Sequence, residues 1–201
     1  MSARAEPLCV TLGFFDNPTS LIYGIGNDGR QDDGLGWAFI DRLEQIRPRP
    51  HACLRRTYQL SLEDADLISR YTRVLFVDAT KDPAVESFSL SRPGPKLDFS
   101  FTSHALSVPA ILATTQQCFD HIPDAYLLAI RGYEWELQQG LTRLAQHNLS
   151  HSLESCRHPG SAGSNPHELR LRETDRAKHA MADLELMGRD RIYPAIREEG
   201  G

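Results

Sequence analysis

An uninterrupted apolar run, Val-Leu-Phe-Val at residues 74–77, is the feature that most constrains how this chain can fold. Successive side chains of a strand point to opposite faces of a sheet, so a strand that is apolar at every position must be covered on both faces. Segments with helical apolar spacing precede and follow the run, which is the order of a βαβ unit. The run therefore predicts a central parallel strand between two layers of helices.

The other expected elements alternate in the same way. Further strands are expected at residues 21–26, 51–60 and 125–130, with an edge strand at 85–90 before a Pro-Gly turn. Helices are expected from Trp37 to just before Pro48, from Ser61 to about residue 68, at 104–119 and at 136–153. This order predicts a three-layer α/β fold, a mostly parallel twisted sheet flanked by helices on both faces.

Composition divides the chain into a domain and two flanking segments. The α/β domain is expected over residues 20–156, after an N-terminal extension over residues 1–19. Residues 157–201 are rich in charged residues, Gly and Pro, and we expect them to form a polar, flexible tail. Within this tail only residues 169–187 have the pattern of a marginal helix.

Charge and hydropathy exclude several classes of function. The formal net charge of -5 argues against nucleic acid and anionic membranes as partners. No apolar stretch approaches the roughly 18 residues that a spanning helix needs, and Glu6 and Pro7 interrupt the N-terminal apolar run. The 4 cysteines are scattered, without a Cys-x-x-Cys pair, which favours a reducing compartment. We therefore expect a cytoplasmic monomer that acts on small molecules or proteins.

The segment at residues 23–36, YGIGNDGRQDDGLG, carries the strongest functional signal. It lies between the first expected strand and the first long helix, and its glycines and aspartates make it longer than the usual connection of about 2 to 6 residues. The composition indicates a loop that is used for binding or catalysis.

A dinucleotide site is one interpretation of this loop. Gly24, Gly26 and Gly29 match the G-x-G-x-x-G pattern that places a pyrophosphate at a helix N-terminus. Two further glycines delay the start of the helix, however, and aspartates stand where phosphates would lie. No acidic residue follows the second expected strand, so this is the less favoured interpretation.

The other interpretation rests on the acids. The Gly-Ile-Gly-Asn run at residues 24–27, followed by Asp-Asp-Gly-Leu-Gly at residues 32–36, resembles the signature of the hydrogenase maturation endopeptidases. The resemblance extends over roughly residues 21–155. It implies the α/β fold predicted above and a peptidase that trims the C-terminal extension of the large subunit of nickel-iron hydrogenases.

Two more residues match that family. Asp78 directly follows the apolar run at residues 74–77, and His104 follows Thr-Ser at the start of an expected helix. The resemblance implies that Asp33, Asp78 and His104 form a metal-contacting trio, and two carboxylates with an imidazole suit a borderline divalent ion. Taken singly, each has a simpler interpretation, with Asp33 as a helix N-cap, Asp78 as a turn residue and His104 as a helix-terminal residue bonded to a loop.

The resemblance also implies how such a site is used. The nickel is presented by the hydrogenase large-subunit precursor, so no permanently bound cofactor is expected. Further substrate contacts are expected from the loops that follow the strands, at Asn27, Asp32, Arg131 and Tyr133. A chaperone that binds nickel or the precursor without cleaving it, on the same fold, is the alternative from another class.

Overall fold

The structure, a computed structural model, describes residues 11–46, 48–96, 106–119 and 121–157, and the statements below concern these residues. The chain divides into two compact units, Met1–Pro159 and Gly160–Gly201, and all described residues lie in the first. The expected tail, its marginal helix and His104 fall outside the described residues.

Five strands form one sheet in the order β2-β1-β3-β5-β4. Neighbouring strands are parallel except for β4, which pairs with β5 in the antiparallel direction at one edge. The strands are β1 (Ser20–Ile25), β2 (Cys53–Thr57), β3 (Arg73–Thr80), β4 (Phe88–Ser91) and β5 (Asp124–Arg131). The expected α/β sheet and its edge strand are therefore confirmed.

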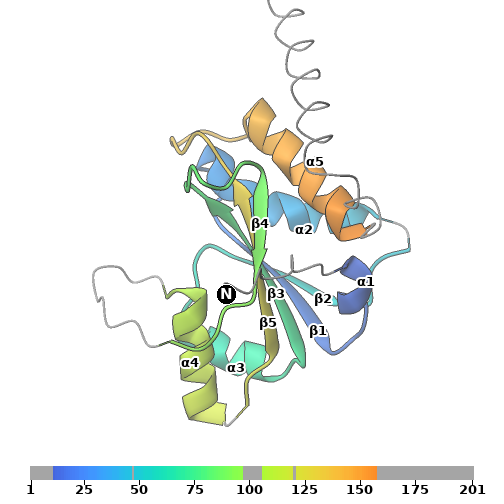
Figure 1. Cartoon of the computed structure of the whole chain (residues 1–201), viewed down its shortest axis with the longest axis vertical. Coiled ribbons are helices and arrows are strands. Elements are labelled where there is room, and N and C mark those ends of the chain that lie inside the picture. The colour runs from blue at the N-terminus through green and yellow to red at the C-terminus, as the bar shows by residue number, and fades with distance from the viewer. Residues whose placement is uncertain (1–10, 47, 97–105, 120, 158–201) are drawn as a thin grey trace, which may run out of the picture. The chain divides into compact units, whose positions relative to one another are not determined.

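Helices cover both faces of this sheet, as Figure 1 shows. On one face lie α1, α2 and α5, and on the other lie α3 and α4. The helices are α1 (Leu12–Phe15), α2 (Leu35–Gln45), α3 (Asp64–Ser69), α4 (Val108–Phe119) and α5 (Arg143–Arg157), and a 3-10 helix, η1 (Gln31–Gly34), precedes α2. Among the described residues, no helix is long and apolar enough to cross a membrane.

The apolar run in β3 joins two separate cores. Leu75 and Val77 pack into the cluster beneath α2 and α5, whereas Val74 and Phe76 pack into the cluster beneath α3 and α4. All four side chains are at most 2% exposed. The prediction of a central strand covered on both faces is confirmed, although β3 continues past the run to Thr80.

The N-terminal boundary differs from the expected one. Residues 12–15 form α1, and Phe15 is only 1% exposed, with its ring edge-to-face on Tyr126 of β5 at 5.6 Å. Residues 11–19 are thus packed onto the sheet instead of extending from it, because two aromatic side chains in this short segment have apolar partners on the core.

Two helices begin later than their periodicity indicates. The helix expected at 104–119 starts at Val108, since Leu106 makes an antiparallel bridge with Leu60, and Pro109 lies in the first turn as expected. The helix expected at 136–153 starts at Arg143, and residues 136–142 form a loop. Before α5, Leu137 and Leu141 continue the apolar spacing of the helix although they lie in the loop.

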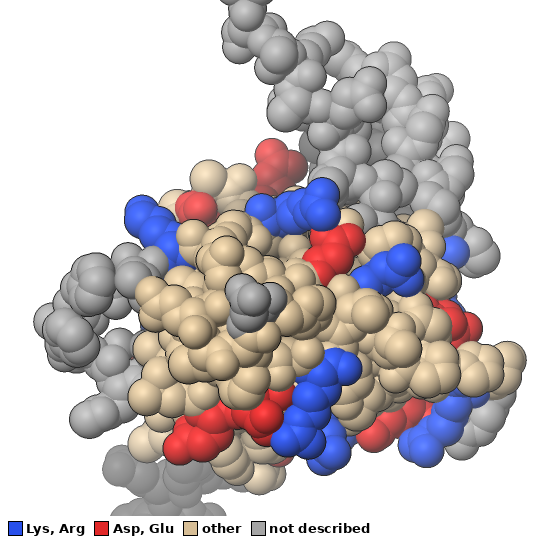
Figure 2. Space-filling model, turned by 90° about the horizontal axis from the view of Figure 1, so that it is seen from below, with Lys and Arg blue, Asp and Glu red and all other residues tan. Residues whose placement is uncertain are grey.

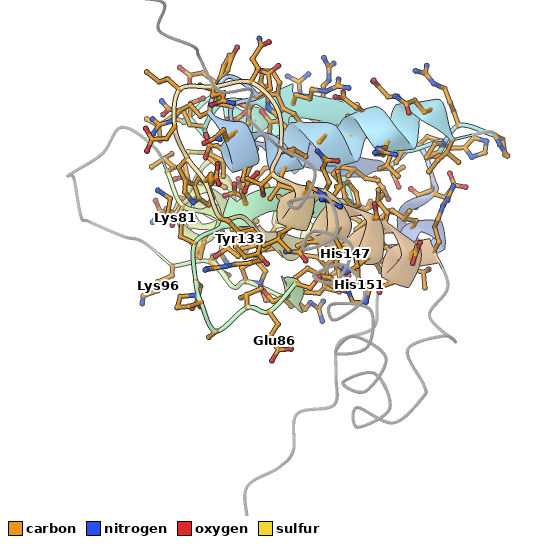
Figure 3. The ribbon with its side chains drawn as sticks, turned by 90° about the horizontal axis from the view of Figure 1, so that it is seen from above. Lys81, Glu86, Lys96, Tyr133, His147 and His151 are labelled. Atoms are coloured by element: carbon orange, nitrogen blue, oxygen red, sulfur yellow. The ribbon has the colours of Figure 1, made fainter. Side chains whose placement is uncertain are left out.

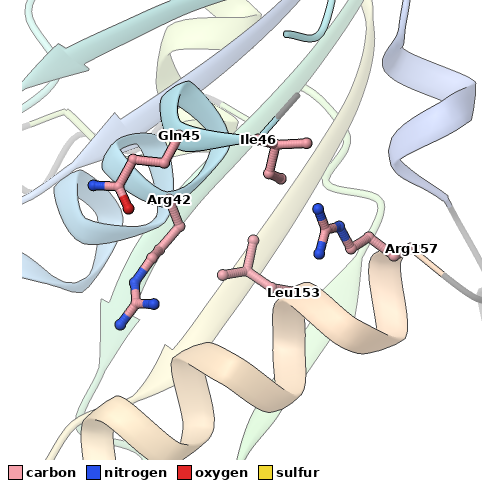
Figure 4. A pocket seen from close by; sticks show the side chains of 5 residues that line it. All are labelled: Arg42, Gln45, Ile46, Leu153 and Arg157. Carbon is pink, nitrogen blue, oxygen red and sulfur yellow. The ribbon is translucent and has the colours of Figure 1, made fainter. Parts of the chain in front are cut away.

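An open hollow of about 300 Å³ lies between α2 and α5 in the described part of the chain. Figure 4 shows its lining, which comes from the C-terminal parts of the two helices. The lining residues are Arg42, Gln45, Ile46, Leu153 and Arg157. Figure 2 shows another face of the molecule, on which acidic and basic side chains lie among one another without a continuous patch of one sign.

Candidate functional site

The sheet has a topological switch point between β1 and β3. The chain leaves β1 for its neighbour β2 on one side and then returns to β3 on the other side. In open α/β sheets the connections diverge at such a point, which leaves a crevice outside the carboxyl ends of the two strands. Asp33 follows β1 and Asp78 lies near the carboxyl end of β3, so both acids belong to this place in the fold.

Glycines bring the start of α2 against these strand ends. A Cβ on Gly36 would lie 2.1 Å from the carbonyl oxygen of Ile25 and 2.5 Å from that of Val77. A Cβ on Gly24 would likewise lie 2.3 Å from the carbonyl oxygen of Gly36. Only glycine permits this approach, which places η1 and Asp33 directly beside β3.

The same packing overturns the dinucleotide interpretation. Gly26 has φ +137°, and a Cβ there would lie 1.9 Å from the Asp33 carbonyl oxygen, so the loop's own backbone occupies the space beside it. The loop amides are also engaged: the N–H of Gly26 donates to Thr57 O and that of Asn27 to Asp33 O. These glycines serve close packing, and the amides that would cradle a pyrophosphate are already bonded.

Asp33 and Asp78 are electrostatically coupled carboxyl groups. Burial raises the pKa of Asp78 to about 6, and the nearby charge of Asp33 adds to this rise, while the Ala79 N–H, which donates to Asp78 Oδ1 at 2.8 Å, opposes it. Burial also raises the pKa of Asp33, against the positive charges of Arg30 and Lys81. Two carboxyl groups with raised pKa values beside the switch point of a parallel sheet are typical of a site that receives a cation or a proton.

Asp33 is not a helix N-cap and Asp78 is not a turn residue, which were the simpler interpretations of each acid taken singly. Gly34 precedes the first residue of α2, and no side chain bonds there as a cap, so Asp33 does not cap this helix. Asp78 lies inside β3, in register with Ala129 of β5, and is not a turn residue. Asp78 lies in the strand instead of just beyond it, and its shared role with Asp33 stays a prediction.

The third member of the expected trio cannot be placed, because His104 lies outside the described residues. Within residues 11–46, 48–96, 106–119 and 121–157, no group of three His, Cys, Asp or Glu residues could hold a metal ion. The described part of the site therefore offers two carboxylate ligands.

Asp32 has a structural role, which corrects its assignment as a substrate contact. Its side chain is fully buried, and its Oδ2 accepts hydrogen bonds from the N–H groups of Tyr133 and Glu134 at 2.8 and 3.1 Å. The N–H of Thr142 donates to its Oδ1 at 2.7 Å, and the Thr142 hydroxyl donates to Oδ2 at 2.8 Å. Asp32 thus ties η1 to both ends of the loop between β5 and α5.

Gln31 reinforces this junction. Its Nε2 donates to Glu134 Oε2 at 2.8 Å, and its Oε1 accepts from the N–H of Glu136 at 2.9 Å. Gln31 is also the one non-glycine residue with positive φ, 47°, among the described residues. These hydrogen bonds hold the strained backbone of Gln31 in place. No local sequence pattern predicts them, because their partners lie more than 100 residues away.

The loop after β5, together with Arg131 at the end of β5 and Lys81 after β3, forms a wall of cations and aromatic rings, and the charge of Lys81 acts on Asp33. The Lys81 ammonium lies over the Trp135 ring at 4.5 Å, and the Arg131 guanidinium lies 5.5 Å from the Tyr133 ring. Arg131 also donates to the Lys81 carbonyl oxygen. Figure 3 shows Lys81 and Tyr133 on the same side of the molecule. Arg131 and Tyr133 were expected here, and Trp135 belongs to the same expected segment, whereas Lys81 was not expected.

Asn27, the last of the expected contacts, stabilises the loop after β1. Its Oδ1 accepts a hydrogen bond from the N–H of Gly29 at 2.9 Å. Its main-chain N–H contacts Asp33 and lowers the pKa of that carboxyl group. Asn27 therefore positions the backbone around Asp33, and its role toward a substrate remains a prediction.

The raised pKa of Asp78 predicts a pH-dependent gain in stability for Asp78→Asn. The carboxyl group ionises at about pH 6 in the folded protein and near 3.8 when unfolded, so its charge costs stability that is fully felt above pH 6 and absent below pH 4. Asparagine keeps the acceptor for Ala79 without the charge. We expect Asp78→Asn to raise the free energy of unfolding by about 2 to 3 kcal/mol at pH 8 and by little at pH 4.

Urea unfolding at the two pH values measures this difference. Asp28→Asn is the matched control, because Asp28 is exposed in the same region and its replacement should change stability by less than about 0.5 kcal/mol. An equal gain at pH 4 and pH 8 would show that burial of charge is not the cause.

The fold is that of known hydrogenase maturation proteases. The chain superposes on such a protease, HycI, from Thermococcus kodakarensis KOD1 with a TM-score of 0.56 and 21% identity, over 70% of this chain and 91% of that one. The maturating endopeptidase HybD from E. coli gives 0.53 and 19%, over 67% and 87%, and a further E. coli endopeptidase gives 0.54 and 19%, over 70% and 93%. No protein-family model and no curated protein matches the sequence.

Proposed function

We propose that this chain is a hydrogenase maturation endopeptidase, which removes the C-terminal extension from a nickel-iron hydrogenase large-subunit precursor after nickel insertion. The observation that carries the proposal is the coupled pair Asp33 and Asp78 at the switch point of the sheet. The fold shared with proteins described as hydrogenase maturation proteases supports it.

The pair suits a metal ion that arrives with the substrate. Two carboxylates that repel each other at close range gain stability when a cation lies between them. With His104 as third ligand, as the resemblance implies, the set has mixed oxygen and nitrogen donors for a borderline ion such as nickel. Three protein ligands leave positions open for the groups that already hold the nickel in the precursor.

In this proposal, the binding of the precursor's nickel site by the two acids positions the peptide bond that is cleaved. With the nickel site engaged by Asp33 and Asp78, the scissile bond lies next to the crevice, where polarisation of its carbonyl or of a water assists hydrolysis. A carboxylate acting as general base is the second route, and Asp78, whose pKa is raised to about 6, is the suitable group for it.

The wall beside the acids supplies contacts for the extended peptide. The Lys81 ammonium over Trp135 and the Arg131 guanidinium near Tyr133 present flat apolar surfaces edged with positive charge. Such surfaces bind peptide backbone and acidic groups with little loss of side-chain freedom. The cytoplasmic location and monomeric state expected from the sequence complete the proposal.

The intact mass of a large-subunit precursor from the same source tests this function. The precursor is incubated with the full chain, with and without prior nickel loading, and with the Asp33→Asn variant as control. Loss of a C-terminal peptide only from nickel-loaded precursor with the native chain would establish the activity and its dependence on nickel. A stable complex with unchanged mass would instead establish the chaperone, and cleavage by both chains would remove Asp33 from the mechanism.

A further inference from the structure

Two histidines outside the candidate site share one exposed face of α5. His147 and His151 are four residues apart, which places them one turn apart on the same side of a helix. Their ring centroids lie 6.4 Å apart with an angle of 35° between the ring planes. Figure 3 shows the two side by side. Two imidazoles on one ion stand about 5 to 6 Å apart, given metal–nitrogen bonds of about 2.0 to 2.1 Å, so a small side-chain rotation brings them to this distance.

The ring of His151 is held by contacts on two sides. Its Nδ1 lies 3.1 Å from the hydroxyl oxygen of Ser87, and its ring packs edge-to-face on Phe88 at 5.2 Å. With the proton on Nδ1 donated to Ser87, the lone pair is on Nε2. Metal-bound histidines characteristically donate their other ring N–H to a neighbouring acceptor, which fixes both tautomer and ring.

His147 is the adaptable member of the pair. Its side chain is exposed and lies beside the His151 ring. One fixed and one free imidazole can close on an ion without backbone movement. No third His, Cys, Asp or Glu among the described residues joins them, so water or a partner's side chain would fill the other positions.

We propose that His147 and His151 form an exchangeable binding site for a borderline divalent transition ion such as Ni²⁺, Cu²⁺ or Zn²⁺. Imidazole nitrogen is a preferred ligand of these ions, whereas Mg²⁺ and Ca²⁺ require oxygen ligands. Two protein ligands with open positions make a site that takes up and releases its ion. This site is independent of the proposed peptidase function and of Asp33 and Asp78.

Paramagnetic line broadening locates the ion directly. Substoichiometric Cu²⁺ is added to the ¹⁵N-labelled full chain carrying Asp33→Asn, so that the candidate site competes less for the ion. We expect the amide signals of residues 147–151 and of Ser87 to broaden first. His147→Asn should abolish this broadening, whereas His121→Asn, which removes an exposed histidine on another segment, should leave it unchanged.

The positioning role of Ser87 has its own readout. Titration calorimetry with Zn²⁺ should show about 10-fold weaker binding for Ser87→Ala, since loss of a group that orients a ligand typically weakens binding by 10- to 100-fold. Ser87→Thr, which keeps the hydroxyl, should restore the affinity. Broadening that persists in His147→Asn, or that centres elsewhere in the Asp33→Asn chain, would overturn the site, and equal Zn²⁺ affinity in Ser87→Ala would overturn the role of Ser87.

Discussion

Asp33→Asn is expected to abolish release of the C-terminal peptide while the protein stays folded. The substitution removes one of the two charges that hold the nickel site of the precursor, and it leaves the main-chain bond from Asn27 to residue 33 intact. Loss of a group that takes part directly in proton transfer or ion binding typically costs about 10²- to 10⁴-fold in rate. Initial rates of peptide release from nickel-loaded precursor, followed by mass spectrometry, measure the effect.

Asp28→Asn provides the matched comparison for activity. Asp28 is an exposed aspartate of the same loop, and the same loss of one charge there should leave the rate within a few-fold of the native value. Equal rates for native protein and Asp33→Asn would rule out the proposed site even if the chain cleaves the precursor. A loss of rate together with loss of the folded state would instead identify Asp33 as structural.

Asp32→Ala is expected to have the largest effect on stability of any substitution in this loop. Its carboxyl group accepts four hydrogen bonds at a position with 0% exposure, and three of the donors are main-chain N–H groups that cannot turn toward solvent. Buried donors left without partners cost about 1 to 3 kcal/mol each. We expect the free energy of unfolding to fall by about 3 to 5 kcal/mol, measured by urea denaturation.

The neighbouring acid supplies the contrast. At neutral pH, Asp33→Asn should leave the free energy of unfolding unchanged or slightly higher in the same experiment, because burial disfavours the ionised form of Asp33 and asparagine removes that charge. The substitutions at the two adjacent aspartates are therefore expected to have different effects: Asp32→Ala lowers stability, and Asp33→Asn lowers activity. Similar stabilities for Asp32→Ala and the native chain would show that the bonds to Tyr133, Glu134 and Thr142 contribute little.

The fold was largely predictable because its central strand is encoded locally. The apolar side chains of residues 74–77 required a strand that is covered on both faces of the sheet. The alternation of apolar runs with helical segments indicated that the strands are parallel. The limits of α4 and α5 were not predictable, because they depend on the bridge from Leu106 to Leu60 and on the loop held by Asp32. Both are contacts between residues distant in sequence.

The candidate site was predictable only in part for the same reason. Asp33 and Asp78 follow from their places after and within neighbouring strands. Asp32 and Asp33 are adjacent aspartates, so the sequence alone does not distinguish their roles. Only the structure shows that Asp32 is buried and hydrogen-bonded to residues about 100 positions further along the chain. Lys81 and Trp135 meet through the packing of two loops, so no spacing within either loop indicates their contact.

The contact of Gly36 with the ends of β1 and β3 has a consequence for how such a chain can diverge. The separation between helix and sheet at this point is set by main-chain atoms that touch each other, with no side chain between them. Main-chain contacts therefore set the relative position of the two acids, and this position does not depend on which side chains fill the apolar interior. Substitutions in the apolar interior that preserve the fold therefore leave this separation unchanged, and the fold is shared with a protein of 21% identity.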